Sequence, residues 1–391
     1  MRIAIFNTVQ LETAGGMEHF CIQTAAHLSS LPGVQADCVT MDDAFNLRYG
    51  QLHSLYFLRL FDRSTIYREP LESIESRLGQ ARYLKCANFR ELTQALGQYD
   101  LIYSRNEITE AFLFHNLIGY HRVPPVIFGC HCPHRYVGAS TLHSLLHNLL
   151  YCSPLYTRLA KRVAGFQTIS TEDTHAIRRQ FPGHPVEQIP NPFDAAGYAA
   201  RAHGVRPQFA VDPERFNILW AGRLTEQKGL GDLCDLIDIV NQTHGKKIDW
   251  HICGDGELRP LIAYIKSRHP NIHSHGHVDR EAMPAAYAAA DLFISTSQWG
   301  ETYAYTPREA NSLGVPVVSY DISGYNEIID DGKNGRLAKS HDDFIEYVKW
   351  FADGNRLESD ITKHIRKKTD TTSAYRQLLR FFKDCLESNS R

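Results

Sequence analysis

Two glutamates, Glu301 and Glu309, stand in the stretch GETYAYTPREA at residues 300–310. The motif at 306–309 fits S/T-x-x-E with proline at the first helical position, so Glu309 is predicted to cap a helix by accepting a hydrogen bond from the Thr306 N–H. That cap leaves Glu301 unexplained. A loop that leads into a helix N-terminus can also receive phosphate, so the stretch predicts a cap and an anion site together.

Two cations follow the predicted strand FNILW, in the stretch AGRLTEQKG at residues 221–229. Arginine supplies a planar fork of donors and lysine a point charge, so Arg223 and Lys228 together suit the neutralisation of a diphosphate leaving group. Solvated surface cations are the alternative, because most Lys and Arg side chains are exposed. Spacing alone leaves both interpretations open.

Glycines occupy two further loops that follow predicted strands. Gly15 and Gly16 precede a helical pattern, and Gly254 lies in CGDGE at 253–257. Glycine lets a backbone approach a ligand closely, although ordinary tight turns use it equally well. The first loop lacks G-x-G-x-x-G, which argues against a dinucleotide-dependent dehydrogenase.

The N-terminal half has a cluster of histidine and cysteine in FGCHCPHRY at residues 128–136. Strand alternation places Cys130 and Cys132 on one face and His131 on the other, and no second ligand pair stands at zinc-finger spacing. We therefore expect no zinc. His131 is interpreted either as an acceptor contact or proton shuttle, or as a hydrogen-bonded structural residue.

Other segments of this half offer weaker signals. Arg105, Asn106 and Glu107 follow the strand DLIYS and either face a ligand or form a solvated loop. The predicted acceptor contacts are Arg105, Asn106, His134 and Arg135. Residues 142–162 are apolar and aromatic with basic residues at the end. This segment is either a helix packed on the first sheet or one that touches a membrane or lipid-linked substrate.

Composition narrows the class of protein. The chain has 391 residues, 43% of them hydrophobic, which favours two domains. Its 42 basic and 44 acidic residues nearly balance, so nothing indicates nucleic-acid binding. No apolar run is long enough to cross a membrane. The 9 cysteines show no disulfide framework, which indicates free thiols in a reducing cytoplasm.

These candidate residues need strands and helices to position them. Short apolar runs alternate with helical patterns, which predicts βα units, parallel sheets and ligands at the carboxyl ends of the strands. The strand candidates are RIAIF, DLIYS, PVIFGC and FQTIS in the first half, and FNILWAG, KIDWHICG, NIHSHGHV, DLFISTS and VPVVSY in the second. The predicted divisions are a first domain at 1–195, a linker at 196–215, a second domain at 216–360 and a helical tail at 361–391.

Taken in order, these motifs resemble the GT-B glycosyltransferases of the family 4 type. The resemblance covers nearly the whole chain and is densest from 217 to 337. It rests on the Gly15-Gly16 loop, IPNPFD, AGRLTEQKG, CGDGE, HGHVDREAMPAAYAAADLFISTS, the two glutamates and EANSLGVPVVS. It implies two Rossmann-like doubly wound domains that face a central cleft, and transfer of a sugar from a nucleotide diphosphate sugar with retention of configuration.

The resemblance also implies roles for individual residues. Arg223 and Lys228 match the pair that binds the donor diphosphate, Glu301 the glutamate near the donor sugar, and Glu309 the ribose contact. His131 matches a histidine near the reacting centre. The remaining donor contacts implied are Gly15, Gly16, Gly254, His277, Val278, Thr302, Tyr303, Ala304 and Tyr305.

The same resemblance implies no metal or other cofactor, a UDP-sugar in preference to a GDP-sugar, and a glycan or lipid-linked acceptor of cell-surface polysaccharide or glycoconjugate synthesis. It places the protein in the cytoplasm, with peripheral membrane contact left open. Thr302, where the family commonly has glycine, and Asn191-Pro192, where many members have Asn-Gly, depart from the pattern. A sugar-nucleotide epimerase and a non-catalytic nucleotide-sugar binder are the alternatives.

Overall fold

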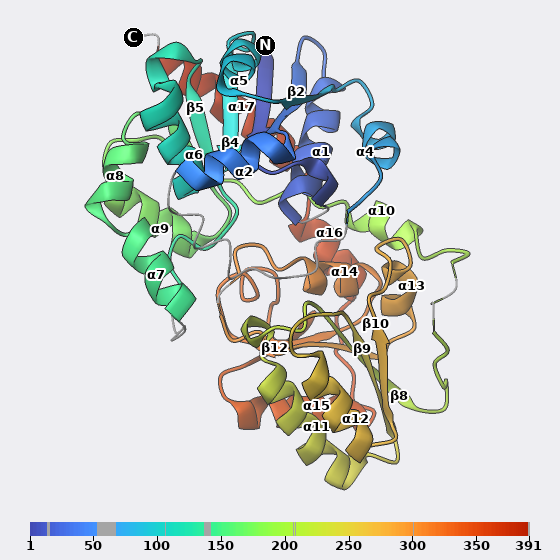
Figure 1. Cartoon of the computed structure of the whole chain (residues 1–391). Coiled ribbons are helices and arrows are strands. Elements are labelled where there is room, and N and C mark those ends of the chain that lie inside the picture. Colours follow the sequence, from blue (N-terminus) through green and yellow to red (C-terminus); the bar gives the residue numbers. More distant parts are fainter. Residues whose placement is uncertain are drawn as a thin grey trace. The chain divides into compact units, whose positions relative to one another are not determined.

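The computed structural model describes residues 1–13, 16–52, 68–105, 107–136, 142–205, 207, 209–299 and 301–389. The chain divides into two compact units (Figure 1). The first contains residues 1–136, 140–191 and 372–391, and the second contains 137–139 and 192–371. Gly15 and Asn106, which were predicted site residues, lie outside the described residues.

The first unit is built on a seven-stranded parallel sheet in the order β3-β2-β1-β4-β5-β6-β7. Its strands are β1 (Arg2–Asn7), β2 (Gln35–Met41), β3 (Tyr83–Cys86), β4 (Leu101–Arg105), β5 (Val126–Cys130), β6 (Gly165–Thr168) and β7 (Val186–Gln188). Its helices are α1 (Gly16–Ser29), α2 (Asp43–Leu52), α4 (Leu71–Leu78), α5 (Phe89–Leu96), α6 (Ile108–Phe112), α7 (Leu142–Tyr151), α8 (Pro154–Ala160), α9 (Thr171–Gln180) and α17 (Thr371–Asn389), with short turns η1 (Leu11–Thr13), η2 (Leu113–Ile118) and η3 (Tyr120–Arg122).

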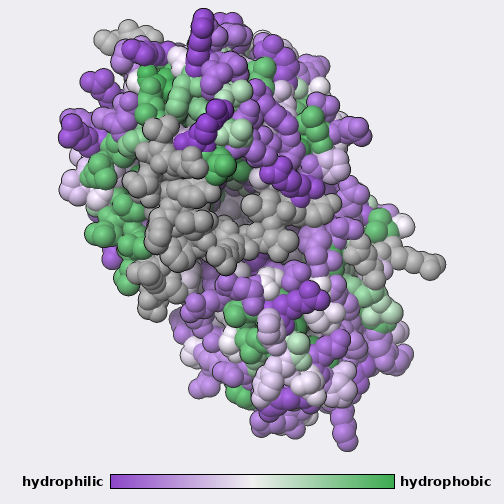
Figure 2. Space-filling view, in the orientation of Figure 1, coloured by the Kyte–Doolittle hydropathy of each residue, from purple (hydrophilic) through white to green (hydrophobic). Residues whose placement is uncertain are grey.

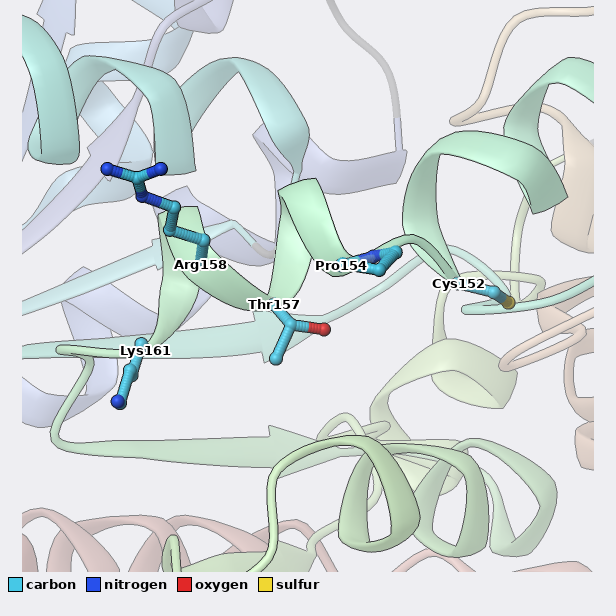
Figure 3. Close-up of a pocket in the computed structure, with 5 residues that line it drawn as sticks. All are labelled: Cys152, Pro154, Thr157, Arg158 and Lys161. Carbon is cyan, nitrogen blue, oxygen red and sulfur yellow. The ribbon is translucent and has the colours of Figure 1, made fainter.

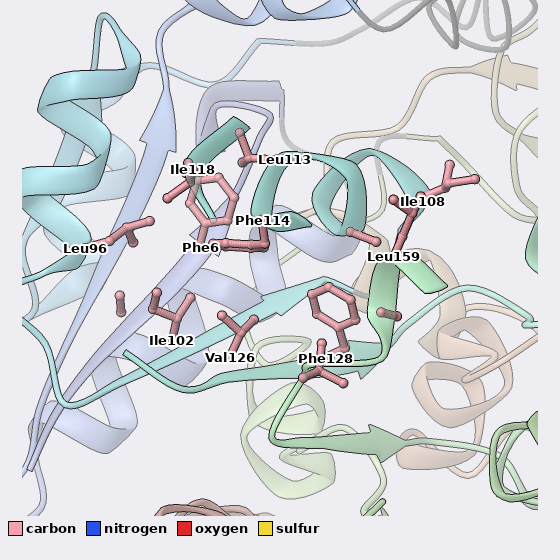
Figure 4. Close-up of a cluster of buried hydrophobic side chains, with 14 of the residues drawn as sticks. Phe6, Leu96, Ile102, Ile108, Leu113, Phe114, Ile118, Val126, Phe128 and Leu159 are labelled. Carbon is pink, nitrogen blue, oxygen red and sulfur yellow. The ribbon is translucent and has the colours of Figure 1, made fainter. Parts of the chain in front are cut away.

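The central strands of this sheet are buried on both faces, which explains the continuous apolar runs of β1 and β5. On one face Phe6 meets the edge of Phe114, with ring centroids 5.6 Å apart, inside the cluster shown in Figure 4. On the other face Ile3 and Ile5 join a core that includes Phe382 of α17. Successive strand residues thus alternate between two cores.

The second unit has a six-stranded parallel sheet in the order β10-β9-β8-β11-β12-β13. Its strands are β8 (Phe216–Ala221), β9 (Ile248–Cys253), β10 (Ile272–Gly276), β11 (Leu292–Ser295), β12 (Val317–Tyr320) and β13 (Gly335–Ala338). Its helices are α10 (Ala195–Ala200), η4 (Glu226–Lys228), α11 (Leu230–His244), α12 (Arg259–Arg268), α13 (Met283–Ala288), α14 (Tyr305–Ser312), α15 (His341–Ala352) and α16 (Ile361–Lys368). One core cluster, with Trp250 and Phe344 fully buried, joins sheet and helices.

The predicted doubly wound α/β fold class is confirmed in both units. Each sheet reverses its strand order at one point, between β1 and β4 in the first unit and between β8 and β11 in the second. Loops at the carboxyl ends of these strand pairs are where open α/β sheets bind ligands.

The divisions of the chain differ from the predicted ones at both ends of the second unit. The predicted linker at 196–215 begins inside helix α10, which spans Ala195–Ala200. The Asp194 side chain caps this helix by accepting a 2.8 Å hydrogen bond from the Gly197 N–H. The predicted tail consists of two helices that belong to different units, α16 to the second and α17 to the first. No helix of the described chain is both long enough and apolar enough to span a membrane.

Candidate active site

Lys228 and Glu301 meet at the reversal point of the second sheet. Lys228 ends η4, after β8, and Glu301 follows β11, and the Lys228 ammonium donates a hydrogen bond to Glu301 Oε1. Their side chains are 21% and 18% exposed. Burial opposes the lysine charge, but the Glu301 carboxylate outweighs it, so the pKa of Lys228 is raised and the ammonium stays charged.

A close backbone approach fixes the position of Lys228. Gly229 adopts a left-handed φ of +65° directly after η4, and a Cβ at this position would lie 1.8 Å from the Thr296 carbonyl oxygen. The Thr296 hydroxyl in turn donates a 2.8 Å hydrogen bond to the Lys228 carbonyl. The loops after β8 and β11 are therefore fastened together, which brings the cation to the carboxylate.

The Glu301 side is held by the turn after β12. The Glu301 N–H donates a 2.9 Å hydrogen bond to the Ser323 carbonyl, and a Cβ on Gly324 would lie 1.8 Å from the Glu301 carbonyl oxygen. The Ser297 hydroxyl donates to Glu301 Oε1 at 3.2 Å, with Tyr325 Oη 3.5 Å from the same oxygen. Sequence reasoning did not identify Ser297, Tyr325 or Thr296: nothing in the local sequence marks Ser297 as a partner of Glu301, and Tyr325 and Thr296 lie 24 and 68 residues from their partners.

The predicted capping box at Thr306 is wrong. Helix α14 begins two residues earlier than this cap requires, at Tyr305, and its N-cap is Ala304, which has φ +44° and no side-chain cap. The Arg308 guanidinium donates a 2.9 Å hydrogen bond to the Ala304 carbonyl and lies 3.6 Å from the centre of the Tyr303 ring. These contacts support the left-handed backbone, which costs an alanine about 1–2 kcal/mol.

The beginning of α14 keeps the features of an anion site. Without a side-chain cap, the N–H groups of its first turn have no intrahelical acceptor. The Thr302 residue is 6% exposed, and its buried hydroxyl has no hydrogen-bond partner among the described residues. Buried polar atoms without partners are uncommon in folded proteins.

Glu309 is partly buried and contacts a tyrosine in place of the predicted cap. The Tyr287 hydroxyl donates a 3.0 Å hydrogen bond to Glu309 Oε2. Burial raises the pKa of Glu309, and Arg280, Tyr287 and Arg201 offset part of that effect. This carboxylate is thus surrounded by donors from other segments.

The other predicted donor contacts of this unit lie in neighbouring loops. A Cβ on Gly254 would lie 1.8 Å from the Gly222 carbonyl oxygen, so this glycine has a structural reason to be there. Val278 is buried and His277 is exposed, just after β10. Arg223 is exposed in the loop after β8.

In the first unit His131 belongs to a chain of hydrogen bonds. The Gln167 amide group donates to the Ile189 carbonyl, so its oxygen is the acceptor of the 2.6 Å hydrogen bond from the Tyr103 hydroxyl. Tyr103 Oη lies 2.8 Å from His131 Nε2. Because the Tyr103 proton is already donated, His131 Nε2 must carry the proton and Nδ1 the lone pair.

This environment keeps His131 neutral. Burial and the Arg105 charge lower its pKa to about 3, and the Asn191 side chain offsets a part of that shift. A base this weak transfers few protons near neutral pH, so the proton-shuttle interpretation is disfavoured and a hydrogen-bonding role is favoured. A Cβ on Gly129 would lie 2.1 Å from Tyr103 Oη, which explains the glycine beside this pair.

Arg105 stands in a buried polar cluster at the carboxyl ends of β1 and β4. Its guanidinium lies 2.9 Å from Glu107 Oε2 and 3.9 Å from Glu110 Oε1. Burial opposes the charge of Arg105, but these two carboxylates outweigh it and raise the pKa. Glu110 also accepts a 2.7 Å hydrogen bond from the Thr8 hydroxyl. Sequence reasoning missed Glu110 and Thr8, which only the parallel sheet brings together.

The other candidate residues of the stretch 128–136 lie in different environments. His134 is 2% exposed, and its ring lies 2.7 Å from Gln180 Oε1, so its predicted acceptor contact is replaced by a structural role. Arg135 is exposed. Cys130 is fully buried and Cys132 exposed. In the described part of the chain, no three His, Cys, Asp or Glu residues are grouped as metal ligands would be.

Residues 205–368 match the family model described as glycosyl transferases group 1. Among the relatives, an uncharacterized 41.2 kDa protein in the cps region of Klebsiella pneumoniae is 30% identical over 132 residues, which are 34% of this chain and 35% of the relative. Spore coat protein SA of Bacillus subtilis is 25% identical over 187 residues (44% and 48%), and phosphatidyl-myo-inositol mannosyltransferase of Mycobacterium leprae is 26% identical over 162 (41% and 42%). The matches thus span between a third and a half of the relatives' length.

Solved structures match over the whole chain. HepE of Anabaena, solved with UDP and glucose, has a TM-score of 0.70 at 17% identity and covers 98% of this chain and 100% of its own. The lipopolysaccharide outer core galactosyltransferase WaaB has a TM-score of 0.64 at 16% identity, with 100% of both chains covered. The chain therefore has the GT-B fold, and its residues 205–368 are similar to the glycosyl transferases group 1 family.

Proposed function

We propose that this protein is a retaining glycosyltransferase that moves a sugar from a nucleotide diphosphate sugar to a hydroxyl group. The observation that carries the proposal is the Lys228–Glu301 pair at the reversal point of the second sheet, where Glu301 lies in the loop that leads into α14. An ammonium that stays charged beside an uncapped helix start is suited to a diphosphate that gains charge as it leaves.

The donor would bind the second unit. Lys228 and Arg223 would contact the diphosphate, the loop from Thr302 to Tyr305 would provide N–H groups, and the buried Thr302 hydroxyl would gain a partner. Glu301 would accept hydrogen bonds from the sugar and Glu309 from the ribose. His277 and Val278 would border the base. UDP is favoured because structures of the same fold, such as HepE, contain UDP.

The proposed reaction exchanges one bond at the anomeric carbon. The bond to the diphosphate oxygen breaks as the acceptor oxygen forms its bond on the same face of the sugar. The acceptor proton passes to the leaving phosphate, so no enzymic base is required. The low pKa of His131, about 3, supports this assignment. His131 would instead accept a hydrogen bond through Nδ1.

The acceptor would meet the first unit, near His131 and Arg105, and would be a glycan or lipid-linked glycan of cell-surface polymers. Cations of the protein perform the charge neutralisation in this scheme, so we propose that no metal is needed and that activity survives EDTA. All nine cysteines are free thiols, which supports a cytoplasmic location.

A donor screen tests the proposal. UDP-, GDP- and ADP-sugars are added separately, and the melting temperature and the fate of the sugar are followed. A bound donor at about 100 times its dissociation constant should stabilise the protein by about 2.7 kcal/mol. Transfer to a hydroxyl, or slow donor hydrolysis, supports a transferase. Isomerised sugar without acceptor would instead show an epimerase, and binding with neither transfer nor hydrolysis would show a non-catalytic binder.

A further inference from the structure

Helices α7 and α8 of the first unit present leucines to solvent. Leu145 and Leu149, one turn apart on α7, are 57% and 70% exposed, and Leu155 on α8 is 54% exposed. Figure 2 shows hydrophobic side chains gathered over α7 and α8 at the left edge of the first unit. The opposite side of α7 packs inward through Leu150 and Tyr151. One side of the segment thus packs on the core and the other side is left unpartnered within its unit.

Basic residues lie beside these leucines. Arg158, Lys161 and Arg162 are exposed at the end of α8. Arg158 and Lys161 line an open hollow of about 450 Å³ together with Cys152, Pro154 and Thr157 (Figure 3). The 3-10 turn η3 lies against the same helix, because the Tyr120 hydroxyl donates a 3.0 Å hydrogen bond to the Leu159 carbonyl.

The charge of this region differs from that of the chain as a whole. Residues 111–171 contain five Lys and Arg and no Asp or Glu, whereas the whole chain has 42 basic and 44 acidic residues. The five are Arg122, Arg135, Arg158, Lys161 and Arg162. The cations are no denser here than in the whole chain, but the segment has no acidic residues to offset them. A net positive charge next to exposed leucines matches the surface of a bilayer with anionic headgroups.

We infer that this face, defined by Leu145, Leu149, Leu155, Arg158, Lys161 and Arg162, docks on an anionic lipid surface. The leucines enter the boundary between headgroups and acyl chains. The cations lie at phosphate level, and the hollow that Arg158 and Lys161 help to line is able to receive one phosphate. Because the argument uses the first unit alone, it does not depend on the donor site or on the proposed reaction.

Sedimentation of the full-length protein with vesicles tests this inference. Vesicles of 30% phosphatidylglycerol in phosphatidylcholine are compared with vesicles of phosphatidylcholine alone. We expect binding to the anionic vesicles that weakens as salt is raised. Leu145→Ser with Leu149→Ser, and Arg158→Ala with Lys161→Ala and Arg162→Ala, should each weaken binding at least about tenfold.

Matched changes elsewhere provide the controls. Leu47→Ser alters another leucine that is 49% exposed, and Arg366→Ala with Lys367→Ala alters exposed cations of α16; both should bind as the unchanged protein does. Melting temperatures check that each variant is folded. Failure to bind anionic vesicles, equal binding to both vesicle types, or equal loss in the controls would overturn the inference. So would binding of a soluble anionic polysaccharide such as heparin through this face in the absence of vesicle binding.

Discussion

Glu309 is a partly buried carboxylate that accepts a hydrogen bond from Tyr287, with Arg280 and Arg201 nearby. Its surroundings come from α10, α13 and the loop after β10. The S/T-x-x-E pattern described a plausible cap, but the helix starts two residues earlier than the pattern requires. Local sequence could predict a helix here, and it marked Glu309 as a candidate ligand contact. It could not predict Tyr287 as a partner, because that contact depends on tertiary packing.

The Glu309→Gln variant distinguishes a role of Glu309 in donor binding from a role in stability alone. Burial raises the pKa of Glu309, so the folded protein holds this proton more tightly than the unfolded chain does. The protonated carboxyl therefore contributes to the free energy of unfolding at low pH, and this contribution is lost as pH rises through the folded-state pKa. The variant should therefore match the unchanged protein at pH 4 and be at least as stable at pH 8. Donor affinity should fall about tenfold, since one charged hydrogen bond is lost.

Thermal unfolding at both pH values and a donor titration measure these two effects. Glu281→Gln, which changes an exposed glutamate of the same unit, serves as the control. Unchanged donor affinity in Glu309→Gln would refute the ribose assignment.

Tyr103 acts on His131 by fixing its tautomer. Tyr103→Phe should lower turnover several-fold and leave donor affinity nearly unchanged, because the phenol contacts the histidine, whereas the donor is assigned to the second unit. With a pKa of about 3, His131 is neutral throughout pH 5–8, so His131→Asn should lower turnover by a similar factor across that range.

Rate measurements across pH 5–8 check this, with Tyr99→Phe, which loses a hydroxyl bonded to Asp37 of the same unit, as the control. A pH limb that is present in the unchanged enzyme and disappears in His131→Asn would contradict a neutral histidine.

At the scale of elements, the joined loops after β8 and β11 position the Lys228–Glu301 pair. Gly229→Ala introduces a Cβ that would lie 1.8 Å from the Thr296 carbonyl oxygen. It also makes the left-handed backbone conformation costly, whereas glycine adopts that conformation freely. We expect a loss of stability of about 2 kcal/mol and at least tenfold weaker diphosphate binding, because Lys228 moves with the loop.

Gly231→Ala is the matched control two residues later. No atom lies within 4 Å of its added Cβ, and alanine favours a helix over glycine, so this variant should be as stable as the unchanged protein or slightly more so. Equal behaviour of the two variants in denaturant titration and donor binding would show that the joined loops do not position the lysine.

The same scale shows what sequence patterns can reveal about the fold. Strands with uninterrupted apolar residues, such as β1, β5 and β11, were predicted. β2 was not, because QADCVTM carries Asp37 and Thr40 in buried positions, where Asp37 is satisfied by Arg82 and Tyr99. β7 has three residues and lies between prolines, which concealed it among turn signals. Polar residues paired by tertiary contacts therefore hide strands from a hydrophobicity pattern.

At the scale of the whole molecule, the chain leaves the first unit at 191 and returns to it at 372. Helix α17 then completes one of the two cores of the first sheet, with Phe382 fully buried among residues of β1, β4 and α1. Phe382→Ala should destabilise the first unit by about 3–5 kcal/mol and leave the second unchanged. Arg376→Ala, an exposed change on the same helix, should have no effect.

Hydrogen exchange followed by mass spectrometry measures the local stability of each unit separately. Faster exchange is expected in the strands of the first sheet alone. Equal loosening of both sheets in Phe382→Ala would mean that the two units do not have separate stabilities.

The most direct test of the donor site is a calorimetric titration of UDP into the unchanged protein, Lys228→Ala and Lys246→Ala. Lys246 is an exposed lysine of the same unit, so its variant controls for loss of charge. UDP should bind the unchanged protein and Lys246→Ala equally, and bind Lys228→Ala at least about tenfold more weakly. Equal affinity for all three proteins, or no affinity for UDP in any of them, would contradict the account.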